Sequence, residues 1–188
     1  MGLFKGVVVE GGNAEFVARE AGTYQMELVE VVAGLRPAGQ FNAEPKPVLR
    51  FVFEDDEGRL SEIVNIPQIV RTPTGEYGLR YSAESKFWRM VGALWGRLVS
   101  EEDAQLLDMD IPGVQSPDDL KRLPLMFTEG AKPVKGVVIR MGSEEITQPG
   151  RAVLLAVSKY TTNSGREANK IVSYAPIPKK AKAGKVPW

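Results

Sequence analysis

The stretch Val48-Leu49-Arg50-Phe51-Val52-Phe53-Glu54 decides the fold of this chain. Large apolar side chains occupy every second position, so one face is fully apolar and the stretch is predicted to be a half-buried β-strand. The acidic turn Asp55-Asp56-Glu57-Gly58 follows, and its glycine supplies the positive φ that tight hairpin turns require. Residues 60–66 alternate again and are predicted to return as the second strand of a hairpin.

A principal helix is predicted after this hairpin. Ser82 or Ser85 is suited to cap its N-terminus, and apolar residues recur at spacings of three and four through Arg97. That length is about four turns. Trp88 and Trp95 share the apolar stripe, and rings at helical spacing more often pack in a core than bind a ligand. We therefore assign both rings to packing.

Other segments show the apolar alternation of strands or the proline, glycine and small polar residues of loops. Strands are expected at 4–10, 24–31, 134–140, 152–160 and 169–175. Loops are expected at 33–47, which contains three prolines, and at 161–169, with the sequence Thr162-Asn163-Ser164-Gly165-Arg166 at its centre. The acid-rich middle of the chain, 100–148, gives a weaker pattern, with a short helix expected near 101–107.

Composition excludes several classes of protein. The 188 residues contain no cysteine and no histidine, which removes disulfides, thiolate nucleophiles, the usual zinc sites and the commonest general acid or base. We therefore expect a protein that is not an enzyme and needs no cofactor. No window reaches the roughly 20 apolar residues of a membrane span, and the N-terminus lacks a signal-peptide pattern, so we expect a cytoplasmic location.

Charge divides the chain unequally. The whole chain has 24 basic and 24 acidic residues, yet residues 151–188 contain eight basic side chains and a single acid, Glu167. Tyr160, Tyr174 and Trp188 are interleaved with these cations. Flat rings among cations are the composition that a groove for single-stranded nucleic acid needs, because rings stack on bases and cations attract phosphates. A solvated basic tail that only maintains solubility is the competing interpretation.

The order of the expected elements is strand, strand, strand, helix, strand, strand, which is the order of the five-stranded OB barrel. We therefore expect a mainly β protein with one principal helix, forming an OB-like barrel. Residues 1–22 would be an N-terminal extension, 23–178 the barrel domain, and 179–188 a flexible basic tail. Residues 101–150 would be an insertion between the helix and the last hairpin.

Part of this pattern resembles a known family. The strand at 49–54, the helix start Ser82-Ala83-Glu84-Ser85-Lys86-Phe87-Trp88 and the helix end Val91-Gly92-Ala93-Leu94-Trp95-Gly96 resemble small phage-encoded OB-fold proteins of the single-stranded-DNA-binding type. The resemblance implies a role in DNA replication or recombination inside a bacterial host cell. It implies no catalytic residue.

The OB interpretation also predicts the binding surface. Such barrels bind strands across strands two and three, flanked by the loop between strands one and two and the loop between strands four and five. The candidate nucleic-acid-binding residues are Arg36, Phe41, Lys46, Arg50, Lys159, Tyr160, Arg166, Lys170, Tyr174, Lys179 and Lys180.

The sequence thus predicts a non-catalytic protein that binds single-stranded nucleic acid, DNA foremost, without sequence specificity. Replication or recombination proteins are further expected partners, no membrane is involved, and the oligomeric state is open. One alternative is a protein-protein module that docks a replication or host-defence partner through the acidic insertion. Another is a metal-dependent hydrolase, which would require the carboxylates of Asp55, Asp56, Glu62 or Asp108 to converge.

Overall fold

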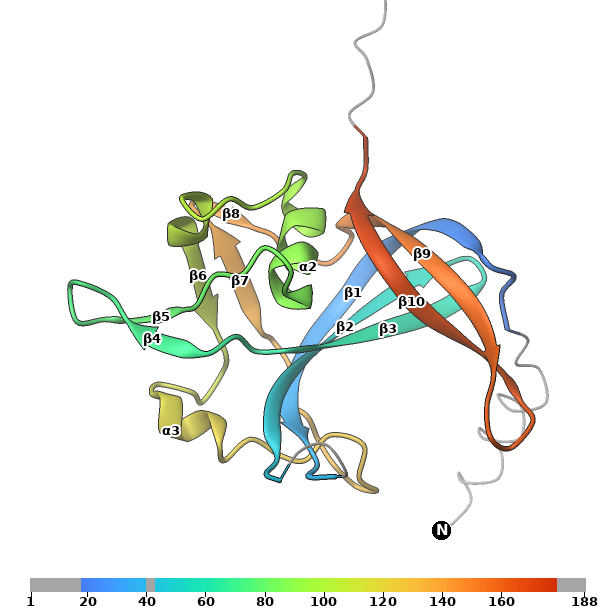
Figure 1. Cartoon of the computed structure of the whole chain (residues 1–188), viewed down its shortest axis with the longest axis horizontal. Coiled ribbons are helices and arrows are strands. Elements are labelled where there is room, and N and C mark those ends of the chain that lie inside the picture. Colours follow the sequence, from blue (N-terminus) through green and yellow to red (C-terminus); the bar gives the residue numbers. More distant parts are fainter. Residues whose placement is uncertain (1–17, 40–42, 179–188) are drawn as a thin grey trace, which may run out of the picture.

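An antiparallel five-stranded sheet with the strand order β10-β9-β1-β2-β3 is the largest element of the protein (Figure 1). The computed structural model describes residues 18–39 and 43–178. The strands of the sheet are β1 (Gly22–Arg36), β2 (Lys46–Asp55), β3 (Gly58–Asn65), β9 (Ala152–Thr161) and β10 (Glu167–Pro176). The additional strand predicted at 4–10 lies outside the described residues.

β1 is long because it pairs with two neighbours. Residues 22–27 pair with β9, and residues from Glu27 to Arg36 pair with β2. A β-bulge falls between Leu28 and Glu30, close to the point where the pairing changes. One strand therefore joins the β9–β10 hairpin to the β2–β3 hairpin.

The alternation predicted for β2 is confirmed. Leu49, Phe51 and Phe53 are fully buried on the inner side of the sheet, where each large apolar side chain contributes about 1.5–3 kcal/mol by leaving water. By the same alternation, Arg50 and Val52 lie on the outer side of β2. Arg50, one of the predicted nucleic-acid-binding residues, therefore lies on the outer side.

The principal helix α2 (Lys86–Trp95) packs against the inner side of the sheet, on β10, β3 and β9. It begins after Ser85, one of the two predicted N-cap residues, and ends before Gly96, whose φ of 105° only glycine adopts readily, so it is shorter than predicted at its C-terminal end. Trp88 is buried, with its ring edge-on to Phe87, and the half-buried Trp95 packs at the border of the same core. The assignment of both tryptophans to packing is confirmed.

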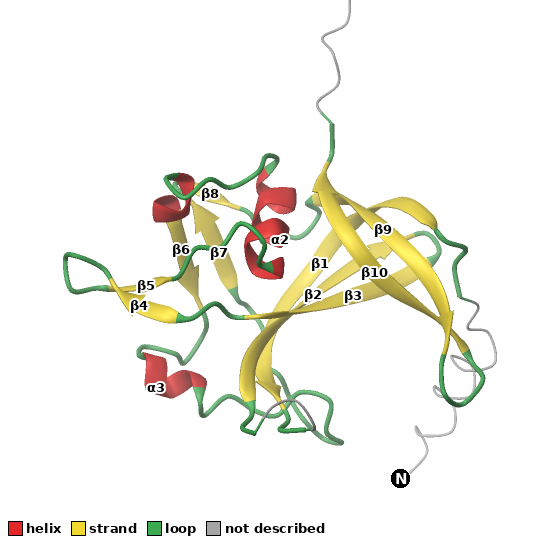
Figure 2. Ribbon diagram, in the orientation of Figure 1, coloured by secondary structure: helices red, strands yellow, loops and turns green. Residues whose placement is uncertain are grey.

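The rest of the described chain forms smaller elements on the other side of α2 (Figure 2). These are the β4 (Ile69–Arg71) and β5 (Tyr77–Leu79) hairpin, the 3₁₀-helix η1 (Asp103–Leu106), β6 (Leu107–Asp110), α3 (Pro117–Leu120), β7 (Val138–Met141) and β8 (Glu144–Glu145). β6, β7 and β8 form a second sheet in that order. They share one apolar core with the five-stranded sheet through α2.

Several predicted boundaries need correction. The strand predicted at 134–140 begins only at Val138, and Val134 instead forms an isolated bridge with Ala33 of β1. The helix expected near 101–107 is a single 3₁₀ turn. The β4–β5 hairpin was not predicted, because three-residue strands are too short to show alternation.

The five-stranded sheet is open. β3 and β10 are its two edges, and within the described ranges no ladder of hydrogen bonds joins them, although the two strands approach each other. The prediction of a mainly β protein with one principal helix is confirmed, whereas barrel closure is not shown. None of the described helices is long and apolar enough to cross a membrane.

Candidate nucleic-acid interface

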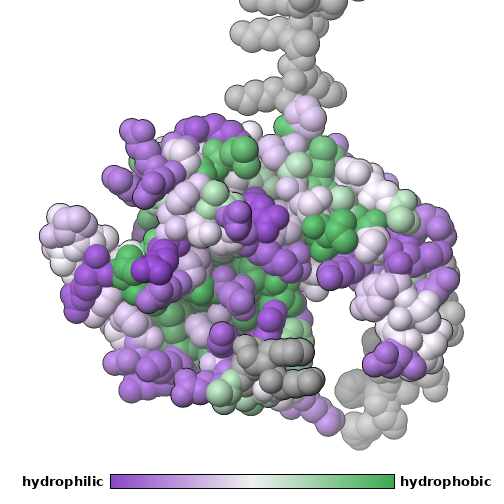
Figure 3. Space-filling view, in the orientation of Figure 1, coloured by the Kyte–Doolittle hydropathy of each residue, from purple (hydrophilic) through white to green (hydrophobic). Residues whose placement is uncertain are grey.

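The outer end of the β9–β10 hairpin projects as an arm, defined here as residues 158–170. β1 begins at Gly22, opposite Val157, so the arm has no β1 partner. In Figure 3 this part of the molecule stands away from the body across an open notch. The notch therefore has two sides, the arm and the end of the sheet where β1 meets β2.

Polar contacts hold the arm in place. The backbone N–H of Arg19 donates to Asn169 Oδ1, and Asn169 Nδ2 donates to the Arg19 carbonyl, both at 2.9 Å. The buried Arg19 guanidinium donates twice to the carboxylate of Asp55, at 2.6 Å each, and these bonds lower the pKa of Asp55. Lys159 Nζ lies 2.8 Å from Glu20 Oε1 and 3.5 Å from Glu167 Oε2. Lys159, a predicted binding residue, is therefore occupied by two carboxylates.

Three other candidates on the arm remain available. Tyr160 is 48% exposed, Arg166 is exposed in the loop between β9 and β10, and Lys170 is exposed on β10. None of the three forms an ion pair or side-chain hydrogen bond with another described residue. A cavity of about 370 Å³ lies between β3 and the arm, and both Tyr160 and Lys170 line it.

Glu62 of β3 also lines this cavity; the sequence named it only for the metal-dependent alternative and not among the nucleic-acid-binding candidates. Burial raises the pKa of its carboxyl group, while the positive charges of Lys86, Lys170 and Arg36 act in the opposite direction. The sequence did contain a signal. Glu62 occupies an inward position of β3, opposite Phe51, where an apolar residue is expected.

Three cations lie on the other side of the notch. Arg36 and Lys46 face each other where β1 and β2 meet the loop between them. Arg50 lies half-buried on the outer side of β2, between Val32 and Ile63. Its Nε is shielded from solvent and has no hydrogen-bond partner among the described residues. A buried donor without a partner costs about 1–3 kcal/mol. A hydrogen bond that this guanidinium donates to an anion would therefore be stabilising.

An exposed ring that the sequence did not predict lies beside these cations. Residues 124–126 run along β1, where Leu35 N donates to the Pro124 carbonyl and Met126 N donates to the Leu35 carbonyl, both at 2.8 Å. The next residue, Phe127, is 59% exposed and has a φ of 74°, a left-handed conformation that is strained for a bulky side chain. No periodic pattern marks this loop, so only the structure places Phe127 here.

Charge is distributed unevenly over the outer side of the sheet. Glu27 lies opposite Glu54 at the end remote from Arg36 and Lys46, and Glu30 follows on the same side. Glu54 accepts a 2.6 Å bond from Arg59. On the outer side of β1 and β2, a polyanion would therefore meet a more favourable potential at the end near Arg36 and Lys46 than at the end near Glu27 and Glu54.

The remaining candidates do not join this surface. The hydroxyl of half-buried Tyr174 donates to the Lys86 carbonyl at 3.1 Å, on the α2 side of β10. Burial, with the negative charge of Glu62, raises the pKa of Tyr174. Phe41, Lys179 and Lys180 lie outside the described residues.

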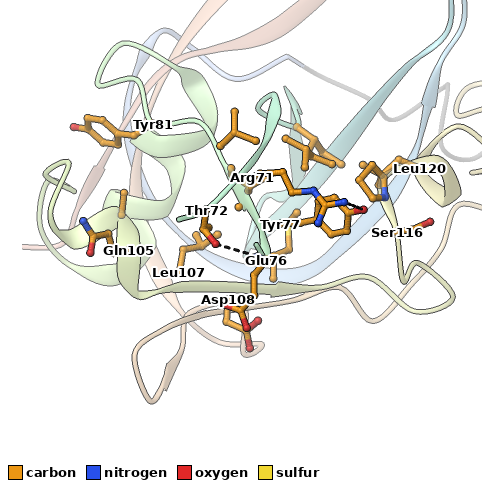
Figure 4. A pocket seen from close by; sticks show the side chains of 18 of the residues that line it. Arg71, Thr72, Glu76, Tyr77, Tyr81, Gln105, Leu107, Asp108, Ser116 and Leu120 are labelled. Carbon is orange, nitrogen blue, oxygen red and sulfur yellow. Dashed lines mark hydrogen bonds between the residues drawn. The ribbon is translucent and has the colours of Figure 1, made fainter. Parts of the chain in front are cut away.

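A second and larger cavity, of about 810 Å³, lies between the β4–β5 hairpin, α2, β6 and α3 (Figure 4). Glu101 and Asp108, both from the acid-rich middle of the chain, line it. Across the described ranges, no three carboxylate side chains gather as they would around a metal ion.

Comparisons with protein-family models, with curated proteins and with solved structures find no match to this chain. The residues and their geometry are therefore the basis of the proposals that follow.

Proposed function

We propose that this protein binds single-stranded nucleic acid, DNA foremost, in the notch between the arm and the β1–β2 end of the sheet. The binding is non-catalytic and independent of sequence, and it serves replication or recombination. The strand order β10-β9-β1-β2-β3, with α2 between the third and fourth strands of the set, supports an OB-like arrangement. In that arrangement the loop that follows β1 and the loop between β9 and β10 flank the ligand.

The observation that carries the proposal is the state of Arg50. Its guanidinium lies at the middle of the outer side of β2, and its shielded Nε has no partner in the part of the chain that the structure describes. Arg36 and Lys46, nearer the loop, form no ion pair with another described residue. A phosphate backbone crossing this end of the sheet would satisfy the guanidinium and neutralise the flanking charges.

Two exposed rings complete the surface, one on each side. Phe127 lies beside β1, and Tyr160 lies on the arm. A base stacked on either ring would add roughly 1–3 kcal/mol, and stacking tolerates every base. Arg166 and Lys170 extend the positive charge along the arm. Single-stranded DNA is therefore a better fit than duplex, whose bases are already stacked.

The test is fluorescence anisotropy of labelled oligo-dT at two salt concentrations, with duplex DNA and single-stranded RNA as competitors. We expect salt-dependent binding that prefers the single strand and persists in a chain ending at Pro178. Absence of binding at low salt would refute the proposal. The alternative of a protein-protein module predicts that result, so the same titration separates the two functions.

Variants locate the site. Lys46→Ala with Arg50→Met should weaken binding about tenfold and reduce its dependence on salt, because two phosphate contacts are lost. Tyr160→Ala with Arg166→Ala should also weaken binding about tenfold and reduce its dependence on salt, because contacts on the arm are lost. Arg122→Ala is the matched control, because this exposed cation lies next to α3 and outside the notch. An equal loss in the control would place binding elsewhere.

A further inference from the structure

The larger cavity has the form of an open groove with an apolar floor. The floor includes the buried side chains of Ile66, Trp88, Ile111 and Leu120. Leu120 comes from α3, on the opposite side of the groove from the β4–β5 hairpin. With about 810 Å³, the groove has room for several side chains of an extended peptide.

The rim of the groove is acidic. Glu76, Glu101 and Asp108 line it with exposed carboxylates, and Asp108 has only a distant Arg140 contact, at 3.8 Å. Arg71 is the lining cation, and its charge is already engaged. It donates to the Gly75 carbonyl at 2.7 Å and to the Tyr77 hydroxyl at 3.0 Å, and it stacks on the Tyr77 ring. Figure 4 shows this stacked pair between Leu120 and Ser116 on one side and Asp108 and Gln105 on the other.

The borders of the groove include strands with a free edge. β6 pairs with β7 alone among the described strands, and the β4–β5 hairpin joins no other sheet. Consecutive residues of β4 and β6, 69–71 and 107–109, line the groove. Free edges offer backbone N–H and C=O groups, which an extended peptide satisfies by pairing as an added strand. The occupant should therefore be an extended, cationic peptide with a large apolar residue.

We propose that the groove binds the C-terminal segment of the same chain, residues 179–188. This segment reads Lys-Lys-Ala-Lys-Ala-Gly-Lys-Val-Pro-Trp and contains no acid. Lys182 and Lys185 face the acidic rim, and Trp188 enters the apolar floor. The inference stands apart from nucleic-acid binding, because it uses a different surface.

The length of the segment permits this contact. Tyr174, four residues before Pro178, is bonded through its hydroxyl to the Lys86 carbonyl at the start of α2. Trp88, two residues further along that helix, lines the groove. Ten extended residues span up to about 33 Å, whereas two residues of helix rise only about 3 Å. The segment is therefore long enough to pass from the β10 side of α2 to the groove on the other side of this helix.

The first experiment titrates a labelled peptide of residues 179–188 onto the chain ending at Pro178. We expect saturable binding that weakens with salt, about fivefold weaker binding to Asp108→Lys, and a comparable loss when the peptide carries Trp188→Ala. Glu84→Lys is the matched control, because this exposed acid lies outside the groove and should leave the affinity unchanged. No saturable binding, or equal weakening in both protein variants, would overturn the proposal.

A second experiment tests the full chain with a photoreactive phenylalanine derivative in place of Trp188. Cross-links should form within one chain and map to residues that line the groove, such as Met109 or Leu120. Cross-links between two copies, or cross-links mapping to the notch, would contradict intramolecular docking. The binding of oligo-dT by the same variant, measured in parallel, distinguishes failure of this inference from failure of the proposed function.

Discussion

The two sides of the notch are attached to the sheet by different interactions. Polar contacts between Arg19, Asp55 and Asn169 hold the arm, together with the ion pairs of Lys159. Two backbone hydrogen bonds and apolar packing hold the segment 124–127 on the opposite side, and its side-chain contacts are apolar, with Met126 fully buried against Val32 and Val48. Changes of pH should therefore act on the arm, whereas changes of side-chain volume should act on the opposite side.

Met126→Ala should produce the largest effect and should loosen only the apolar side. Truncating a fully buried methionine removes apolar contacts and leaves a cavity, at a cost of about 2–5 kcal/mol in the free energy of unfolding. Urea denaturation measures that loss, and hydrogen exchange should accelerate in 124–135 more than in 158–170. The control Leu98→Ala, at a side chain 82% exposed, should change stability by less than about 0.5 kcal/mol. Equal acceleration in the arm would show that the two sides are not independent.

Asp55→Asn should loosen the arm through its polar anchor. The Arg19 guanidinium loses its charged partner, which costs about 1.5–3 kcal/mol at neutral pH. Because folding lowers the pKa of Asp55, its contribution to stability is present above the ordinary aspartate pKa of about 3.9. That contribution is lost as the pH falls from there through the lower pKa of the folded state.

Urea midpoints measured from pH 7 to pH 3 test this prediction. The gap between the parent protein and Asp55→Asn should be widest at neutral pH and should close in acid. Asp56→Asn, which changes the neighbouring exposed carboxylate, is the control and should follow the parent. A gap as wide at pH 3 as at pH 7 would mean that the carboxylate charge of Asp55 is not what stabilises the arm.

The sequence could predict the elements that depend on local signals, but not the contacts between residues remote in sequence that hold the two sides of the notch. The β2–β3 and β9–β10 hairpins were predicted because alternation and turn residues are local signals, and the same alternation assigned Arg50 to an outward position. The contacts of Lys159 could not be predicted, because Glu20 is remote in sequence. The position of Phe127 likewise depends on hydrogen bonds between Pro124, Met126 and a distant strand.

Gly34→Ala is a second test of the apolar side of the notch, because it tests how closely the segment 124–127 packs on β1. A Cβ atom at Gly34 would lie 3.0 Å from both the Pro124 carbonyl oxygen and Met126 Cε, so the segment 124–127 would have to shift. Overpacking of this kind costs about 1–3 kcal/mol. The free energy of unfolding of Gly34→Ala should fall, whereas that of Gly39→Ala should not, because no atom of the described residues lies within 4 Å of a Cβ atom there. A stable Gly34→Ala protein with unchanged hydrogen exchange at 124–135 would contradict the close packing described.

The smallest effect is expected from Tyr174→Phe, which tests whether polar contacts also hold the base of the hairpin. The variant keeps the half-buried ring and removes only the hydroxyl that donates to the Lys86 carbonyl, so the loss should be about 0.5–1.5 kcal/mol. Tyr160→Phe is the matched control, since its exposed hydroxyl forms no hydrogen bond with another described residue. If polar contacts dominate along the whole hairpin, Tyr174→Phe should accelerate hydrogen exchange in β10 and leave 124–135 unchanged. Unchanged exchange in β10 would confine the polar attachment to the arm and assign the base of the hairpin to packing against α2.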